Sequence, residues 1–289
     1  MIYILMNAIY FSLYLSKYRG KNNPIVNCLI YALDTLQPHK TGNFDTVVFI
    51  CDEIGGIKEY LSNRYDWVTF VDFEFDPTNY YKGHMGFHKW SNMLTFLEMP
   101  YDNILFLDCD VYFTKDPSYI FEKYDDDKYY ALYQSYYTKN DHYIVVDPNN
   151  KVIIRNGKYF DFDDVAGFKG INSGQMLFKK KHIELVKDNF VNNMFMNHQT
   201  IEHKIDKLVI EGVLHPGVGE MSFWMTEQHA GQKAFMDVGI EIAEFDRNDI
   251  NQTLHPTRDP AITHYIYHVN KDVLPAEYQS IEIVSSVTG

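Results

Sequence analysis

The chain has 289 residues, of which 46% are hydrophobic and 22% charged, and its formal net charge is −13. This composition is typical of a globular protein with a sizeable core. An acidic chain without clustered Lys and Arg argues against a nucleic-acid-binding surface. A metal ion could still recruit a small phosphorylated ligand. The three cysteines are widely spaced in apolar runs, which indicates buried thiols in a reducing compartment.

The chain begins with a mostly apolar stretch over residues 2–15. A membrane-spanning helix needs about 20 apolar residues. A signal peptide would carry its basic residues before the apolar run, whereas here they follow it. We therefore expect a first strand over 2–7, no transmembrane segment and a cytoplasmic location.

Strand and helix patterns alternate over the first 110 residues. Apolar and β-branched runs predict strands over 2–7, 46–51, 67–75 and 103–110. Helical spacing of apolar residues predicts helices over 23–37, 53–65 and 88–99. This alternation predicts an α/β fold with a mostly parallel central sheet and helices on both faces. In open sheets of this kind, ligands bind beyond the carboxyl ends of the strands.

The pattern becomes mixed after residue 111. A polar segment over 136–169 is typical of an insertion or a hairpin. Before it we expect a helix over 117–124 and a strand over 128–135. After it we expect strands over 174–180 and 262–268 and helices over 182–195, 201–210 and 219–231. Neither an internal repeat nor a Pro/Gly-rich linker marks a boundary, so we predict a single domain over 1–289.

The segment YDNILFLDCDVYF carries the strongest chemical signal. Apolar residues 104–107 bring a buried strand to its end, and Asp108 and Asp110 follow with one residue between them. If the strand geometry continues, alternation directs both carboxylates to the same side. Two such carboxylates form a hard-oxygen site for Mg²⁺ or Mn²⁺, with phosphate oxygens and water in the remaining positions. The alternative is an acidic strand end without a metal.

The segment THYIYHVNK groups His264, His268 and Lys271 around an expected strand. An imidazole can complete the coordination of Mn²⁺, and an ammonium group can balance a departing diphosphate. A single His of this kind also fits an ordinary structural or surface position, so its meaning depends on its neighbours in space.

The segment GINSGQMLF places Asn172, Ser173 and Gly174 just before an expected strand. Gly allows a ligand to approach the backbone closely, and the amide and hydroxyl groups can bind sugar hydroxyls. Lys89 lies on the helix that precedes the acidic pair. The alternative for the Asn172-Ser173-Gly174 segment is an ordinary turn, and the alternative for Lys89 is a lysine that is only solvated at the surface.

The order of these segments resembles the glycogenin-like family of nucleotide-sugar glycosyltransferases, glycosyltransferase family 8, which has a GT-A fold. YDNILFLDCDVYF matches that family's metal-binding strand "YDxhLYLDxDhhh", and its "NSG" before an apolar strand is matched at 172–174. The family's C-terminal "HYxGxxKPW" is matched only loosely, because Tyr267 replaces the Gly, one extra residue precedes Lys271 and no Pro-Trp follows. The resemblance extends from residue 2 to about 275.

The resemblance implies a metal and nucleotide site. Asp108, Asp110 and His264 would bind Mn²⁺ or Mg²⁺, with His268 as the alternative third ligand, and Lys271 would contact the diphosphate.

The resemblance also implies contacts to the rest of the donor. The sugar would face Lys89 and the Asn172-Ser173-Gly174 segment, and the first strand would bring Asn7 and Tyr10 to the base. This chain has Gln134 where the family has an Asp, and Glu220 is the nearest counterpart of the Asp-Gln pair that leads a late helix.

The implied reaction is transfer of a hexose or related sugar from a nucleoside-diphosphate donor, by the family's habit a UDP-sugar, to a glycan, protein-linked or other hydroxyl acceptor. Retention of the anomeric configuration is implied as well. Glu220, Gln134 and Asp163 are candidates to stand beside the anomeric carbon, and we favour Glu220. Residues 1–110 would form a nucleotide-binding half, 111–275 an acceptor-side half with an insertion at about 136–170, and 276–289 a tail.

Two other functions fit parts of the sequence. A haloacid-dehalogenase-type phosphatase would use Asp108 as nucleophile and the DFDD segment at 161–164 as its second acidic motif. That class places its first motif near the start of the chain, whereas about a hundred residues precede it here. A sugar-nucleotide-binding protein without turnover would explain the imperfect C-terminal motif.

Overall fold

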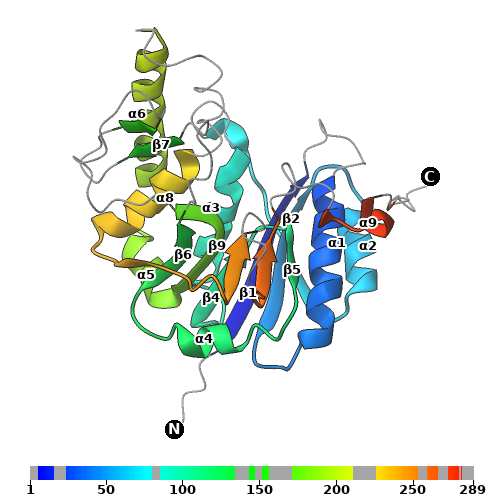
Figure 1. Cartoon of the computed structure of the whole chain (residues 1–289). Coiled ribbons are helices and arrows are strands. Elements are labelled where there is room, and N and C mark those ends of the chain that lie inside the picture. Colours follow the sequence, from blue (N-terminus) through cyan, green and yellow to red (C-terminus); the bar gives the residue numbers. More distant parts are fainter. Residues whose placement is uncertain are drawn as a thin grey trace.

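The computed structural model in Figure 1 describes residues 6–15, 24–79, 85–133, 143–146, 152–155, 171–210, 226–252, 259–265, 273–279 and 281. Five residues with predicted roles lie outside these ranges: Gln134, Asp163, Glu220, His268 and Lys271. Their roles stay predictions.

A seven-stranded sheet forms the centre of the molecule, in the order β10-β6-β9-β4-β1-β2-β3. Its strands are β1 (Asn7–Leu15), β2 (Asp45–Asp52), β3 (Val68–Asp72), β4 (Asn103–Leu107), β6 (Tyr129–Tyr133), β9 (Ile171–Lys179) and β10 (Ile242–Glu244). Adjacent strands are parallel except where β9 pairs with β4 and β6. Because β9 alone runs against its neighbours, the carboxyl ends of β1 to β4 meet at one edge.

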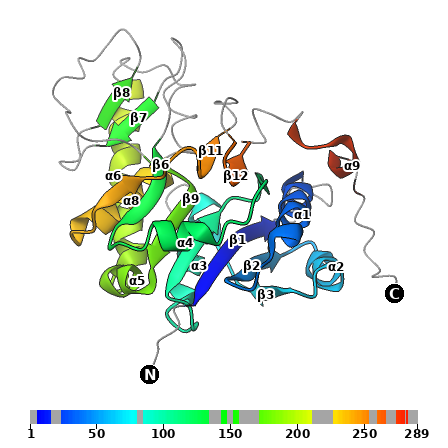
Figure 2. The same ribbon diagram turned by 60° about the horizontal axis from the view of Figure 1, so that its bottom comes forward.

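Helices cover both faces of this sheet, which confirms the predicted fold class. The first cluster of buried side chains joins one face to α1 (Pro24–Leu36) and α2 (Ile57–Arg64). The second joins the other face to α3 (His88–Thr95), α5 (Lys180–Val186), α6 (Phe190–Ile210) and α8 (Thr226–Asp237). Figures 1 and 2 both place α1 and α2 away from α5, α6 and α8.

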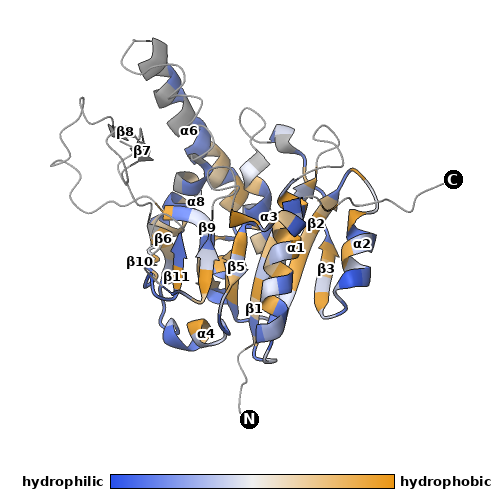
Figure 3. Ribbon diagram, turned by 45° about the vertical axis from the view of Figure 1, so that its right-hand side comes forward, coloured by the Kyte–Doolittle hydropathy of each residue, from blue (hydrophilic) through white to orange (hydrophobic). Residues whose placement is uncertain are grey.

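The strands in the middle of the sheet are apolar nearly throughout, because both of their faces are covered. In β1, Ile9 and Phe11 belong to the first cluster while Ala8 and Tyr10 belong to the second. Figure 3 shows the same pattern, with hydrophobic colouring along β1 and hydrophilic colouring on much of α2.

Smaller elements complete the fold. A three-stranded sheet has the order β11-β12-β5, from β11 (Ile250–Gln252), β12 (Ile262–His264) and β5 (Val111–Phe113). Within the polar segment, β7 (Tyr143–Val146) and β8 (Val152–Arg155) pair antiparallel as a hairpin. The short helices are α4 (Tyr119–Lys123), α9 (Ala276–Gln279), η2 (Gln37–His39), η3 (Pro77–Asn79) and η5 (Met85–Phe87). None of the helices that the structure describes is long and apolar enough to cross a bilayer.

Two of the strand boundaries that differ from the sequence prediction move candidate site residues. β1 begins at Asn7, where the predicted first strand over 2–7 ends. β9 begins at Ile171 and includes the Asn-Ser-Gly segment that was expected to precede it. The first difference arises because an apolar stretch allows more than one strand register, and pairing with neighbouring strands decides between them. The second arises because β6 pairs with β9 as far as Ile171.

Candidate functional site

The acidic pair lies where β4 ends and β5 begins. β4 ends at Leu107, so the strand geometry does not continue through Asp108 and Asp110 as expected. Backbone hydrogen bonds fix this short connection instead. The Asp108 N–H donates to the carbonyl of Gly174 in β9 at 2.8 Å, and the Tyr265 N–H donates to the carbonyl of Asp110 at 3.0 Å. The connection is therefore held between the central sheet and the end of β12.

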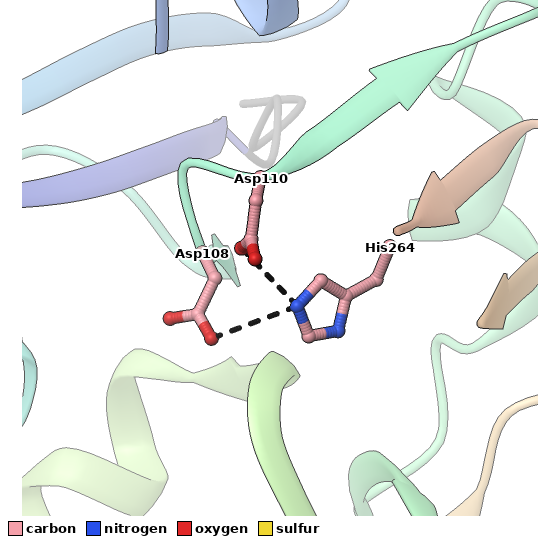
Figure 4. Close-up of side chains that lie close together, drawn as sticks. All are labelled: Asp108, Asp110 and His264. Carbon is pink, nitrogen blue, oxygen red and sulfur yellow. Dashed lines mark hydrogen bonds and ion pairs between the residues drawn. The ribbon is translucent and has the colours of Figure 1, made fainter. Parts of the chain in front are cut away.

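Asp108, Asp110 and His264 converge on one point (Figure 4). Nε2 of His264 lies 3.1 Å from Oδ1 of Asp110 and 4.0 Å from Oδ2 of Asp108. One ligand atom from each of the three residues lies within 4.8 Å of the others. His264 reaches this point because β12 pairs antiparallel with β5, which sets His264 opposite Val111.

The electrostatics of the group reflect burial and crowding of like charge. Burial raises the pKa of Asp108, and the neighbouring Asp110 carboxylate adds to this, while the Lys89 ammonium opposes it without cancelling it. Burial lowers the pKa of His264, but the Asp110 and Asp108 carboxylates outweigh it, so the pKa lies above its ordinary value of 6.5. Two carboxylates side by side, with Asp110 buried and Asp108 partly exposed, are stabilised by added positive charge.

The donor set fits a divalent cation. Two carboxylates supply the hard oxygen ligands that Mg²⁺ and Mn²⁺ share, and the imidazole nitrogen favours Mn²⁺ over Mg²⁺. The three side chains leave further coordination positions to other ligands, as a catalytic site requires.

Lys89 lies beside the acidic pair at the end of a buried chain of polar groups. Its ammonium is 4.0 Å from Oδ1 of Asp108 and 3.0 Å from Oε1 of Glu227, and it donates to Oγ of Ser173 at 2.6 Å. Ser173 in turn donates to Glu227 at 2.9 Å. Burial lowers the pKa of Lys89, but the Glu227 and Asp108 carboxylates together raise it above its ordinary value. Lys89 is therefore a fixed positive charge at the site.

Glu227 and Gln228, at the start of α8, were missed by the sequence analysis. Glu227 is 3% exposed and binds Lys89, while the side-chain oxygen of Gln228 accepts the Ser173 N–H at 2.8 Å. The available signal was an acidic and an amide side chain side by side at 227–228 in an expected helix. The sequence analysis chose Glu220 for the Asp-Gln pair, and the role of Glu220 stays a prediction.

The Asn-Ser-Gly segment lies against the group formed by Asp108, Asp110 and His264. Oδ1 of Asn172 accepts the N–H of Gly174 at 2.7 Å. A Cβ atom at position 174 would lie 2.6 Å from Oδ2 of Asp108 and 2.9 Å from Cε1 of His264. The absence of a side chain at Gly174 therefore makes room for the side chains of Asp108 and His264.

Asn7 and Tyr10 do not lie beside the acidic pair, and their contact with a base stays a prediction. β1 begins at Asn7 and pairs it with Asn103 at the start of β4, so Asn7 lies at the opposite edge of the sheet from Asp108. Tyr10 is fully buried, and its hydroxyl donates to the carbonyl of Lys89 at 3.2 Å. Neither contacts the carboxyl edge, because β1 extends further along the chain than predicted.

Four rings lie where β1 and β3 end, and we call them the edge rings: Tyr14, Phe73, Phe75 and His88. Tyr14 and Phe75 meet edge to face with ring centroids 5.3 Å apart, and Phe73 stacks on His88 at 6.2 Å. His88 is held by a 2.5 Å hydrogen bond between its Nδ1 and Oγ of Ser12 in β1. The carboxyl edge thus combines a charged end at β4 with an aromatic end at β1 and β3.

No family model and no curated protein matches this chain. Similar solved structures include a galactosyltransferase in complex with donor and acceptor sugar analogs, with 11% identity, 90% of this chain and 87% of that chain covered, and a TM-score of 0.48. Mouse xyloside xylosyltransferase 1, in its apo form, has 12% identity and a TM-score of 0.49, with 90% of this chain and 98% of that chain covered. The inositol-1-phosphate CTP transferase from T. maritima has 14% identity and a TM-score of 0.46, with 96% of each chain covered. Similarity at this level carries neither a family nor an activity over to this chain.

Proposed function

We propose that this protein is a metal-dependent glycosyltransferase that transfers a sugar from a nucleoside-diphosphate donor. The observation that carries the proposal is the convergence of Asp108, Asp110 and His264 beside the buried ammonium of Lys89. Such a site suits a diphosphate, because it combines metal ligands with a fixed positive charge.

The position of the site in the sheet supports the same proposal. The strand order reverses between β1 and β4, and the connections on either side of this point cover opposite faces. In open α/β sheets, the crevice at such a switch point is where nucleotides bind. We propose that the diphosphate lies at Asp108 and the base at the edge rings, so that the donor spans from β4 toward β1.

The residues would divide the chemistry between them. Asp108, Asp110 and His264 would hold the cation, which when bound supplies positive charge to the leaving diphosphate. Lys89, held by Glu227 and Ser173, would keep its ammonium turned toward the donor. Fixed charge of this kind stabilises the transition state without reorganisation during the reaction.

The finer assignments extend this proposal. We propose Mn²⁺ as the metal because an imidazole joins the carboxylates. UDP as the nucleotide, a hexose as the sugar, retention of configuration and a glycan or protein-linked acceptor are expected from the resemblance to the glycogenin-like family. We further propose that the whole chain forms a single GT-A unit, because one sheet takes strands from Asn7 through Glu244.

Calorimetry and donor hydrolysis test the proposal together. Titration of UDP- and GDP-sugars with and without Mn²⁺ should find a nucleotide that binds only with the metal, and that complex should release nucleoside diphosphate on incubation with acceptors. Asp110→Ala should lower turnover by about 100-fold or more while the fold is kept.

The rival functions predict other results. Metal-dependent binding without any sugar transfer would indicate a binding protein. A trapped aspartyl-phosphate on Asp108 without donor hydrolysis would indicate a phosphatase, and either result would overturn the proposal.

A further inference from the structure

The indole of Trp90 is fixed to the buried polar chain from the side opposite Lys89. Trp90 follows Lys89 on α3 and is 1% exposed. Its Nε1–H donates to Oε2 of Glu227, while Oε1 of the same carboxylate binds Lys89 and Ser173. The two oxygens of Glu227 are thus divided between the indole on one side and the Lys-Ser pair on the other.

The Trp90 ring also sets how closely α3 and α8 approach. Gly231 lies four residues after Glu227, so both are on the same face of α8. A Cβ atom at position 231 would lie 2.3 Å from the Trp90 ring. The ring therefore lies directly on the backbone of α8 at Gly231 while its N–H holds Glu227, and this double contact fixes α8 against the helix that carries Lys89.

Fixing the carboxylate has a consequence for the ammonium. A buried carboxylate needs hydrogen-bond donors on both oxygens. If the indole N–H is lost, Oε2 loses this donor. The carboxylate can then turn toward Lys89 and Ser173, and such a turn would move the ammonium relative to Asp108. A displacement of about 1 Å in a charged group at an active site can cost on the order of 100-fold in rate.

We propose that Trp90 is a positioning residue for the transfer reaction, because its N–H and its contact with Gly231 orient Glu227 and thereby keep the Lys89 ammonium beside Asp108. The inference rests on the proposed function for the reaction itself, but the contact between the indole and Glu227 stands on the geometry alone.

A double-mutant cycle tests the role. Trp90→Phe keeps an aromatic ring and removes the N–H. Assayed well below its melting temperature, it should lower kcat by on the order of 10-fold to 100-fold and leave KM for the donor within about twofold. In a Glu227→Gln background the same change should have little further effect, because the group through which Trp90 acts has already lost its charge.

Trp67→Phe is the matched control. The Trp67 indole N–H is buried, and it has no hydrogen-bond partner among the described residues. Its replacement should leave kcat unchanged and should combine additively with Glu227→Gln. Effects of Trp90→Phe that add fully to those of Glu227→Gln would overturn the inference, because they would show that Trp90 does not act through Glu227.

Nuclear magnetic resonance tests the contact without any turnover. The chain has three Trp residues, Trp67, Trp90 and Trp224, so their indole signals can be assigned with single Trp→Phe variants. Glu227→Gln should move the Trp90 indole proton upfield and leave that of Trp67 in place. An unmoved Trp90 signal would overturn the inference. A wild-type protein that transfers no sugar would instead overturn the proposed function, and a shifted Trp90 signal would distinguish that failure from a failure of the contact.

Discussion

Replacing Gly174 by Ala should weaken metal binding while the fold is kept. Gly174 lies in β9, its carbonyl accepts the Asp108 N–H, and its φ is not in the left-handed region, so the backbone accepts an alanine. The added Cβ would meet Oδ2 of Asp108 at 2.6 Å, Oδ1 of Asn172 at 2.8 Å and Cε1 of His264 at 2.9 Å. Two of these three atoms belong to the proposed metal ligands.

The size of the effect can be estimated from these distances. Ordinary contact begins at 3.4 Å, so Oδ2 of Asp108 would have to withdraw by about 0.8 Å and Cε1 of His264 by about 0.5 Å. Metal–ligand distances tolerate changes of only about 0.2 Å. Disturbing the groups that support metal ligands typically costs 10-fold to 100-fold in affinity, and because two ligands move here we expect about 100-fold for Mn²⁺.

Stability should respond differently from metal affinity. Gly→Ala at an unstrained position stabilises the folded state by about 0.4–1 kcal/mol through the unfolded chain, which partly offsets the local displacement. The melting temperature without metal should therefore change little, while the rise on adding Mn²⁺ and nucleotide should be lost. Calorimetry measures the affinity, and a thermal-shift titration measures both melting temperatures.

Gly42→Ala provides the control for Gly174→Ala. A Cβ at Gly42 would meet nothing within 4 Å, but its φ of +84° strains any other residue. This variant should lose stability and keep the Mn²⁺-induced rise. Wild-type Mn²⁺ affinity in Gly174→Ala would refute the reasoning, because the ligands would then have accommodated a side chain that the geometry excludes.

Two further predictions concern the charges around the site. Lys89→Met keeps most of the length of the side chain but leaves the Glu227 charge buried without its cation. Urea unfolding should therefore show a loss of roughly 3–5 kcal/mol, part of which the double variant Lys89→Met/Glu227→Gln should recover. Because the pKa of His264 is raised above 6.5, a proton competes with the metal, and Mn²⁺ affinity measured by calorimetry from about pH 5.5 to about pH 8 should rise with pH, less steeply in His264→Gln. The folding stability of the metal-free protein should change with pH in the opposite direction. The attraction between protonated His264 and Asp110 is fully present below pH 6.5 and is lost as the pH rises through the raised pKa of His264. A flat affinity profile would contradict the assignment of His264 as a ligand.

The parts of the site that depend on local patterns could be predicted from sequence. The buried run of β4 and the two acids after it are contiguous, so a strand that ends at these acids could be predicted, whereas backbone hydrogen bonds to Gly174 and Tyr265 fix the connection that carries them. His264 was chosen through the loose resemblance of THYIYHVNK to a family motif, and the structure brings it to the acids.

The parts that depend on distant pairing could not be predicted. Asn7 was assigned to the wrong end of β1, because an apolar stretch does not reveal where its neighbours will pair with it. Glu227 lies at the start of an amphipathic helix, where an acidic residue is usually explained by the helix dipole. Its partner Trp90 is 137 positions away, and only the packing of α8 on α3 brings the two together.

The position of β12 in the chain has a consequence for how the protein is made. His264 is 154 positions from Asp110, whereas the last strand of the central sheet ends at Glu244. During synthesis, every strand of that sheet is therefore available before the imidazole is. A nascent chain can complete its main scaffold while still lacking the proposed third ligand, so the proposed metal site is complete only when β12 joins β5.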